Sequence, residues 1–284
     1  MPLTAIITDT DSSLPIDLAK QYNIIQVPIM IQFGEESFRD VFDIDNAAVF
    51  TRVDREGKLP TTAAPSPGKF IEAFKSAFAA GADKILCLTI SSEMSAVYSS
   101  ARAAAEMFDE KTIKVVDSRT VSFGEGLMVL EAAKSIQAGA SLDEAVAAAE
   151  AVRDCTHLFA ALSTVKYLAM SGRVGQVAAG FASLLDVKPI LTLRNEKLEM
   201  LERIRTLNKA LARVIQLSLD AAGDCAIEQL AILHVNAPEA AHKFELQVRT
   251  AMACPTEIRC VEMTPGLSIH TGAGLVGIVV VTEK

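Results

Sequence analysis

The sequence predicts an α/β protein with two domains, an N-terminal domain built on a parallel sheet and a C-terminal α+β domain. Short apolar runs rich in β-branched residues alternate with longer helical patterns in the first part of the chain. That alternation is typical of a parallel sheet covered by helices. Near Thr156 the rhythm changes, and strand-like runs follow one another more directly. Half of the 284 residues are hydrophobic and the mean hydropathy is +0.31, so a large apolar interior is available.

The first part of the chain contains four expected strands and at least three expected helices. We expect the strands at residues 3–7, 24–31, 84–90 and 112–117. Helical patterns occupy residues 14–22, 95–108 and 126–136. Ser141 and Glu144, in the stretch SLDE, form a capping box, so a further helix begins there.

The second part of the chain combines a hairpin with two passages from strand to helix or loop. Strands are expected at residues 156–162, 188–193, 197–205, 230–235 and 256–263, with a closing strand after Gly277 and a helix at residues 238–252. We place the domain boundary near Ala160, which gives domains of residues 1–160 and 161–284. Because no linker rich in Gly, Ser or Pro separates them, the two domains should pack tightly and share a cleft.

Composition and charge argue against several classes of function. The net charge is −8 and the isoelectric point about 5.1, and no cluster of Lys and Arg occurs, so nucleic acid and anionic membrane surfaces are poor candidate partners. No apolar run approaches the roughly 20 residues of a membrane span. The five cysteines form no C-x-x-C pattern and the four histidines show no metal spacing, so no metal site is expected. We expect a cytoplasmic protein with reduced thiols.

Asp9 and Asp11 follow the first expected strand, in the stretch TDTDSSLP. An Asp-x-Asp pair in this position resembles the nucleophile motif of haloacid-dehalogenase phosphatases, which use a carboxylate nucleophile and Mg²⁺. The later acidic pair of such a site is missing, since the stretch VVDSRT offers only Asp117. We therefore favour helix capping for these side chains, with the helix beginning near Leu14. A Mg²⁺-dependent phosphatase remains the alternative hypothesis.

Two further stretches carry small polar residues. In LPTTAAPSP, Ser66 should cap a helix with Pro67 at its first position, whereas Thr61 and Thr62 have no evident local role. The stretch TISSEMSAVY places three serines within five residues where an expected strand meets a helix: Ser91, Ser92 and Ser95. A helix N-terminus has unpaired N–H groups and favours an anion, and one cap needs only one serine.

The stretch TPGLSIHTGAGLVGIVVV contains His270 in an expected loop and a G-x-G-x-x-G pattern at Gly272, Gly274 and Gly277. A dinucleotide site requires this pattern at the start of a helix, whereas here it precedes a strand, so no nucleotide site is expected. We expect the glycines to let the loop turn tightly or approach a ligand. Ser95 and His270 could form a nucleophile–base pair, but EMSAV lacks the glycines of a nucleophile elbow.

Taken together, these stretches resemble the DegV family of bacterial fatty-acid-binding proteins across essentially the whole chain. The matching segments, in chain order, are TDTDSSLP, TTAAPSP, ISSEMSAVY, DSRTVSFGEG, YLAMSGRVG, KPIL and GLSIHTGAGLVG. Each segment is weak evidence alone, but seven in the correct order make a specific pattern. The resemblance implies a DegV-like fold of two domains with one long-chain fatty acid in a buried tunnel between them.

The resemblance also implies roles for individual residues. The fatty-acid carboxylate should bind near Thr62, Ser95 and His270, with Arg173 in the same neighbourhood. Further candidates for supporting contacts are Thr61, Ser92 and Gly272. Proteins of this type present the carboxylate to a separate ATP-dependent kinase that forms the acyl phosphate. The chain itself is then expected to be a binding protein without a cofactor rather than an enzyme. A carrier of another lipid-like carboxylate is a second alternative.

The chain departs from the family pattern beside the expected head site. Alanines or valine replace the usual residues at Ala63, Ala64, Ala96, Val97 and Ala273. At least three polar groups are thereby lost. These departures imply one of two outcomes: either the carboxylate is recognised less strongly, or Thr61 and Ser92 substitute for the missing groups.

Overall fold

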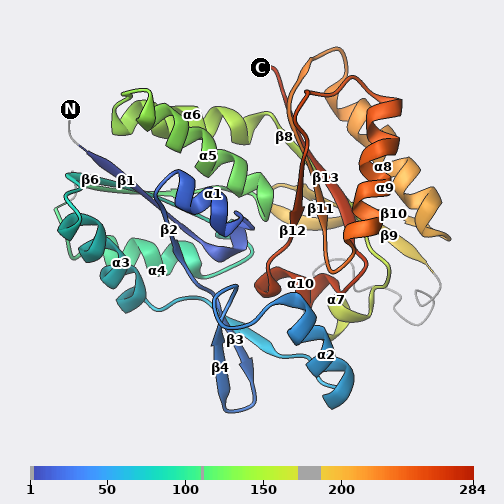
Figure 1. Ribbon diagram of the computed structural model, residues 1–284, viewed down its shortest axis with the longest axis horizontal. Helices are drawn as coiled ribbons and strands as arrows, with labels where there is room; N and C mark the ends of the chain where they lie inside the picture. Colours follow the sequence, from blue (N-terminus) through green and yellow to red (C-terminus); the bar gives the residue numbers. More distant parts are fainter. Residues whose placement is uncertain (1–2, 110–111, 172–186) are drawn as a thin grey trace.

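The computed structural model describes residues 3–109, 112–171 and 187–284, and three sheets organise these parts of the chain (Figure 1). The first sheet has the order β2-β1-β6-β7. Its strands are β1 (Thr4–Asp9), β2 (Ile24–Val27), β6 (Lys84–Thr89) and β7 (Ile113–Asp117). Every pairing in it is parallel. The strand β6 is buried along nearly its whole length, as expected for a parallel strand with both faces covered.

Helices cover both faces of this parallel sheet (Figure 1). The pair α5 (Phe123–Gln137) and α6 (Leu142–Asp154) packs together on one face. The pair α3 (Pro67–Ala79) and α4 (Val97–Ala105) packs on the other. The short helix α1 (Ile16–Gln21) joins β1 to β2. The capping box predicted at Ser141 and Glu144 is confirmed at the start of α6.

The second sheet has the order β10-β9-β8-β13-β11-β12. Its strands are β8 (Thr156–Ala161), β9 (Lys188–Arg194), β10 (Lys197–Ile204), β11 (Ile227–His234), β12 (Arg259–Glu262) and β13 (Val276–Thr282). All pairings are antiparallel except that of β11 with β12, which agrees with the predicted α+β character and the predicted hairpin of β9 and β10.

The two faces of the second sheet pack against different parts of the molecule. On β8, Phe159 and Ala161 join the core beneath α8 (Leu207–Ala222) and α9 (Pro238–Ala251). The alternate residues Leu158 and Ala160 join the larger core that also contains the side chains of the first sheet. The period of two along a strand therefore places one row of apolar side chains between the two sheets.

A third, small sheet was not predicted. It has the order β4-β3-β5, with strands β3 (Met30–Phe33), β4 (Glu36–Arg39) and β5 (Thr61–Ala63), and it carries α2 (Asn46–Glu56) at the lower end of the molecule (Figure 1). The single strand expected at residues 24–31 is wrong, because Pro28 separates β2 from β3. Proline has no N–H for a ladder, so the chain leaves the first sheet here and enters the third.

Several expected boundaries also change. The short 3-10 helix η1 (Thr10–Ser12) follows β1, and Asp9 caps this turn by accepting from the Asp11 N–H, so the predicted cap of a helix near Leu14 is wrong. Ser66 and Pro67 do occupy the N-cap and first positions of α3, although the Ser66 side chain makes no capping hydrogen bond. The predicted domain boundary near Ala160 falls inside β8, all of which pairs within the second sheet.

Within the described residues, no helix is both long enough and apolar enough to cross a membrane.

Candidate binding site

A cavity lies between the first and second sheets, with about 820 Å³ of empty space when its opening to solvent is included. Leucines from four strands or their ends form much of its wall: Leu158, Leu191, Leu198 and Leu233. They belong to the second sheet and point away from α8 and α9. From the N-terminal side, Ile90, Met94 and Val121 complete the apolar lining. This apolar lining suits an apolar ligand.

The polar part of the wall contains the three head-site residues predicted from the sequence. Thr62 comes from β5, Ser95 from the turn before α4, and His270 from the last turn of α10 (Pro265–Thr271). Thr62 Oγ1 and His270 Nε2 lie 3.3 Å apart, within hydrogen-bond distance. All three residues are partly buried. The fold therefore brings together, at one cavity, side chains that are up to 208 residues apart in the sequence.

A tight turn presents Ser95 to the cavity. Ser91 O accepts from the N–H groups of both Met94 (3.0 Å) and Ser95 (3.1 Å), and the Ser91 N–H donates to Thr120 O. The helix α4 begins only at Val97, with Ala96 at its N-cap and no side-chain capping bond. The expected helix start at residue 95 is thus two residues early, and Ser95 precedes the helix instead of capping it.

His270 lies in α10 and not in the loop that the sequence predicts. Thr264 occupies the N-cap position, Pro265 the first helical position, and Gly272 follows the end with φ +82°. Proline at the start and glycine just past the end are a recognised helix signature, so the signal was present in TPGLSIHTG. Gly266 and His270, four residues apart, both line the cavity from one face of this helix.

The closing glycines pack against other parts of the fold, and the positive φ values of Gly272 and Gly274 agree with the expected tight turn. A Cβ added at Gly272 would lie 2.2 Å from a ring carbon of Tyr167, and one at Gly274 would lie 3.0 Å from Ser163 Oγ. At Gly277 it would lie 2.8 Å from the Ala160 Cβ of the neighbouring strand β8. Gly272 is not part of the cavity wall.

The other predicted supporting residues have different outcomes. Thr61 and Ser92 are exposed and do not line the cavity. The Ser92 N–H donates to the Asp117 carboxylate at 3.2 Å, which ties the turn before α4 to the end of β7. Arg173 lies outside the described residues.

The sequence reasoning missed a buried junction at the start of α10. The Gly266 N–H donates to Asp40 Oδ1 (3.1 Å), and the Thr10 hydroxyl donates to Asp40 Oδ2 (2.7 Å). Burial raises the pKa of Asp40 to about 6. A Cβ added at Gly266 would lie 2.8 Å from Asp11 Oδ1, so only glycine allows this close approach. No pattern in the sequence around Asp40 distinguished it from a surface acid.

The geometry around Asp9 gives this side chain a structural role. Asp9 is fully buried, and its two carboxylate oxygens accept from the N–H groups of Asp11 (2.9 Å) and Ile90 (3.0 Å). Burial raises its pKa, which disfavours the charged form that a nucleophile needs. Across the described ranges, no group of three His, Cys, Asp or Glu residues is arranged to hold a metal ion. The contacts therefore give no support to the phosphatase alternative.

The described residues thus form an α/β fold in which an apolar cavity with one polar wall lies between a parallel and a largely antiparallel sheet. The family model described as "Uncharacterised protein, DegV family" matches residues 3–283. The chain belongs to the DegV family.

Relatives match the chain over nearly its full length. A DegV domain-containing protein of Streptomyces coelicolor is 32% identical over 276 residues, covering 97% of both chains. A second, from Caldanaerobacter subterraneus, is 31% identical over 278 residues, covering 98% of both.

Solved structures share the same fold. The chain resembles a DegV family protein of Thermus thermophilus, described by its fatty acid binding, with a TM-score of 0.92, 29% identity and full coverage of both chains. It also resembles DegV of Bacillus subtilis, described as a fatty acid binding protein, with a TM-score of 0.86, 26% identity and full coverage of both chains. These findings agree with the family and the fold predicted from the sequence.

Proposed function

We propose that this protein binds one long-chain fatty acid in the cavity between its two sheets, with the carboxylate at Thr62, Ser95 and His270. One observation carries the proposal: an apolar cavity whose polar wall collects these three side chains from distant segments. The fatty-acid binding stated for two structural relatives supports the same ligand class.

The lining explains how such a ligand gains affinity. Each buried CH₂ group contributes about 0.8 kcal/mol, so a sixteen-carbon chain gains roughly 12 kcal/mol before the costs of association. The leucine rows of the second sheet supply the apolar surface that this gain requires. The tail then carries most of the affinity, and the head site has to orient the carboxylate more than to hold it.

The head site can orient the ligand carboxylate without neutralising its charge. Thr62 and Ser95 contribute hydroxyl groups, and such donors leave a carboxylate charged and nucleophilic. Because all three head-site residues are only partly buried, the carboxylate end lies nearer to solvent than the tail. We propose that this exposed end is presented to an ATP-dependent kinase that forms the acyl phosphate, so that the protein acts as a carrier and not as the enzyme.

Ligand identification by mass spectrometry tests the proposal. Protein purified under native conditions, and extracted with organic solvent, should release about one fatty acid per chain. A different apolar carboxylate in that amount would instead support a carrier of another lipid-like acid. The absence of any stoichiometric lipid would contradict the proposed function. Mg²⁺-dependent phosphoester hydrolysis that is lost in Asp9→Asn would restore the phosphatase hypothesis.

A further inference from the structure

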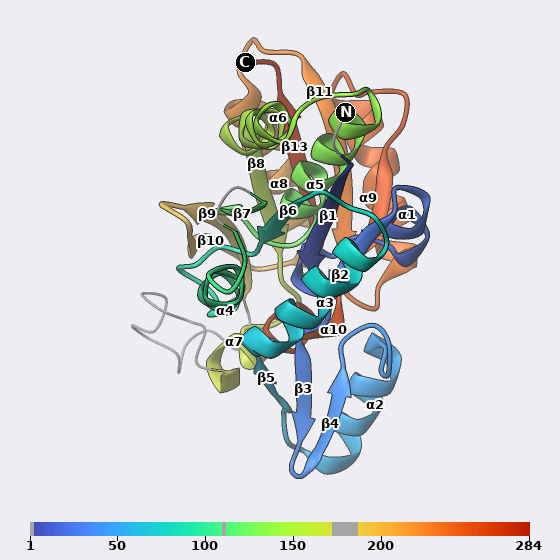
Figure 2. The ribbon, with the colours of Figure 1, turned by 90° about the vertical axis from the view of Figure 1, so that its left-hand side faces the viewer.

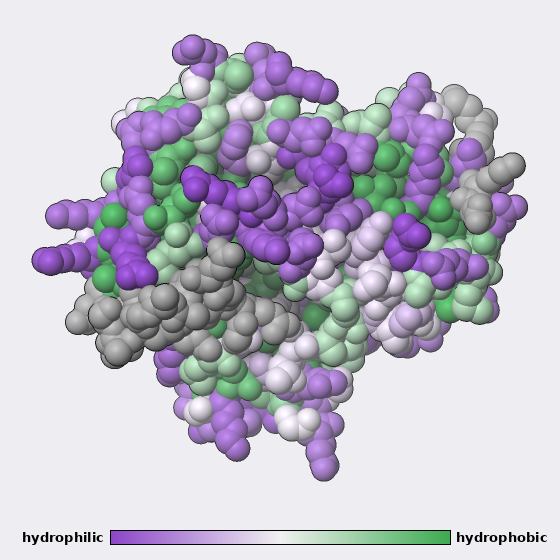
Figure 3. Space-filling model, turned by 180° about the vertical axis from the view of Figure 1, so that it is seen from behind, coloured by the Kyte–Doolittle hydropathy of each residue, from purple (hydrophilic) through white to green (hydrophobic). Residues whose placement is uncertain are grey.

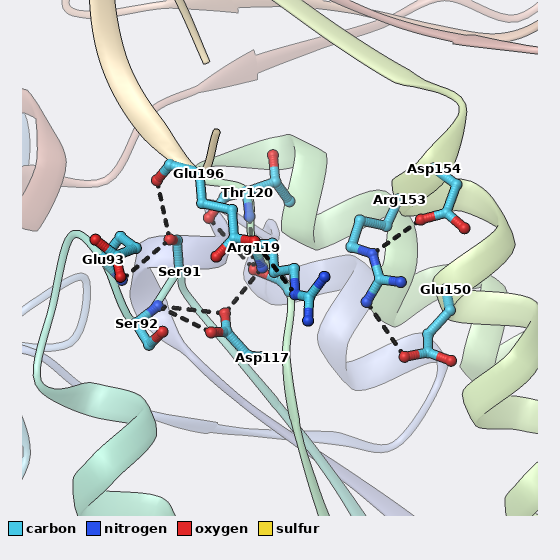
Figure 4. Close-up of polar contacts among 11 residues, drawn as sticks. Ser91, Ser92, Glu93, Asp117, Arg119, Thr120, Glu150, Arg153, Asp154 and Glu196 are labelled. Atoms are coloured by element: carbon cyan, nitrogen blue, oxygen red, sulfur yellow. Dashed lines mark hydrogen bonds and ion pairs between the residues drawn. The ribbon is translucent and has the colours of Figure 1, made fainter. Parts of the chain in front are cut away.

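The turn of the hairpin formed by β9 and β10 rests on the segment that presents Ser95 (Figure 4). Ser91 Oγ donates to Glu196 O at 3.1 Å, which joins the N-terminal part of the chain to the second sheet. Asn195 and Glu196, the two central residues of the turn, both have positive φ, at 48° and 66°. This conformation is that of a tight hairpin turn, so the turn residues present a defined carbonyl to Ser91.

Two ion pairs flank this hydrogen bond. Lys197 Nζ lies 3.0 Å from Glu93 Oε2, and Arg119 Nε lies 3.5 Å from Glu196 Oε1. Both pairs are substantially exposed. Figure 3 shows the molecule from behind, where hydrophilic side chains form a band across the middle. We name the contacts of Glu196 and Lys197 with Ser91, Glu93 and Arg119 the hairpin latch.

The hairpin latch adjoins the cavity in the sequence. Each of its three segments reaches the cavity wall within one or two residues: Leu198 follows Lys197, Met94 follows Glu93, and Val121 lies two residues after Arg119. Opening the latch would therefore separate the walls of the cavity. The turns after β6 and β7 would stay joined to each other, because Asp117 accepts from the N–H groups of Ser92 and Arg119 (Figure 4).

We propose that the hairpin latch positions the turn that carries Ser95 and sets the rate at which the ligand enters and leaves the cavity. This inference rests on the proposed function. Exposed ion pairs are individually weak and are screened by salt. A latch made of them opens without unfolding either sheet and closes again, as repeated loading and release of one ligand require. Lys197, Glu93 and Arg119 are thus positioning residues and make no contact with the carboxylate themselves.

Fatty-acid exchange kinetics test the latch. The probe is cis-parinaric acid, a fluorescent fatty acid, whose release into excess oleate is followed by stopped flow. Lys197→Glu should speed release about fivefold at low salt by placing like charges together. Adding Glu93→Lys should restore the release rate to within about twofold of the original protein, because the exchanged charges can pair again. Lys69→Glu, which breaks the exposed Lys69–Glu72 pair on α3, is the matched control and should leave release unchanged.

Salt provides a readout that a merely structural role would not change. Release from the original protein should become faster as salt is added, whereas release from Lys197→Glu should slow or stay constant. If cis-parinaric acid does not bind the original protein, the proposed function itself fails. If it binds, but Lys197→Glu releases it at the rate of Lys69→Glu, or the paired substitution brings no recovery, the latch is refuted while the proposed function stands.

Discussion

Ser95 lies at a polar wall that is only partly open to water, so a hydrogen bond from its hydroxyl to a charged ligand is worth more than one at the surface. Its own backbone is held by Ser91 and not by the Ser95 side chain. The hydroxyl is therefore available to a ligand without cost to the local structure. A substitution that removes the Ser95 hydroxyl should therefore affect ligand binding and leave the stability of the fold nearly unchanged.

We expect Ser95→Ala to weaken fatty-acid binding by about 1.5–3 kcal/mol, the value of a hydrogen bond to a charged group, while the free energy of unfolding changes little. Competition with cis-parinaric acid measures the first quantity and chemical denaturation the second. Ser99→Ala is the matched control, because Ser99 is exposed on α4 and its hydroxyl donates to Ala96 O. Equal affinities of the two variants would remove Ser95 from the head site.

Gly272 shows how one residue can be required for packing beside a binding site. Its φ of +82° disfavours any side chain, and the ring of Tyr167 occupies the place of a Cβ. Tyr167 in turn packs edge-on against Phe50 of α2, with ring centroids 5.8 Å apart. A change at Gly272 would therefore be felt across the contact of α7 (Lys166–Ser171), α10 and α2.

Gly272→Ala should lower the free energy of unfolding by roughly 2 kcal/mol or more, through backbone strain and the clash with Tyr167. Gly57→Ala is the control for a positive φ without a clash: Gly57 has φ +66° and nothing within 4 Å of an added Cβ, while its ψ of 14° differs from the 161° of Gly272. That control should cost only about 1 kcal/mol. Thermal or chemical denaturation compares the free energies of unfolding of the two variants. Equal losses would show that the Tyr167 ring moves aside for the added Cβ at no energetic cost.

At the scale of elements, the ends of the helices depend on local chemistry to different degrees. In α6, the Ser141 side chain accepts from the Glu144 N–H, while Glu144 Oε2 accepts from the Ser141 N–H at 2.7 Å. In α4 and α10, no side chain caps the first turn, and at α10 a tertiary contact, the hydrogen bond from the Gly266 N–H to Asp40, holds the start of the helix. The start of α10 therefore depends on a residue distant in the sequence, whereas the start of α6 depends on residues three positions apart.

Ser141→Ala should cost about 1 kcal/mol of folding stability, because the N-cap acceptor of α6 is lost. It should leave fatty-acid affinity unchanged, since α6 does not line the cavity. Chemical denaturation and ligand competition check the two statements on one sample. A loss of affinity comparable to that of Ser95→Ala would mean that α6 communicates with the site.

At the scale of the whole molecule, the start of α10 joins the parallel sheet, the third sheet and the second sheet at one point (Figure 2). The Thr264 hydroxyl donates to Thr10 O, the Asn46 amide donates to Met263 O, and Asp40 accepts from the Gly266 N–H. These contacts are buried, so the junction is fixed, whereas the hairpin latch on the other side of the cavity is exposed. The cavity therefore has one rigid and one labile side.

The free energy of unfolding should fall as the pH rises through the pKa of Asp40 in this junction. Burial raises the pKa of Asp40 from its ordinary value of 3.8 to about 6, so the folded protein binds a proton that the unfolded chain has released. The stabilisation is complete below pH 3.8 and is lost as pH rises towards 6 and above. Between pH 5 and pH 7, Asp40 alone should lower the free energy of unfolding by about 1 kcal/mol.

Asp40→Asn, which keeps the size of the side chain, should remove that part of the pH dependence. Denaturation at pH 5 and at pH 7 measures it, and Asp45→Asn serves as the control, because Asp45 is exposed and caps α2. An unchanged slope in Asp40→Asn would show that Asp40 stays charged in the folded protein over this range. Asp9, whose pKa burial also raises, contributes in the same direction.

Features that depend on interactions between neighbouring residues could be predicted from the sequence. Three of the four apolar runs expected in the parallel sheet, the β9–β10 hairpin and the capping box at Ser141 depend on neighbouring residues and were confirmed. The break between β2 and β3 also had a local signal, because Pro28 lacks the N–H that a strand needs and interrupts the apolar run around it. The helix around His270 also had one, in Pro265 and Gly272, but the glycine pattern obscured it.

The sequence by itself determined the family, the kinds of element in each half of the chain and the identity of Thr62, Ser95 and His270 as head-site candidates. Only the tertiary structure decided that Gly272 packs against Tyr167, that Asp40 receives the start of α10, and that the β9–β10 turn reaches Ser91. The physical reason is sequence separation. Periodicity and capping act over a few residues, whereas these contacts join segments about 100 to more than 200 residues apart, and their energies depend on burial that exists only after the sheets have packed together.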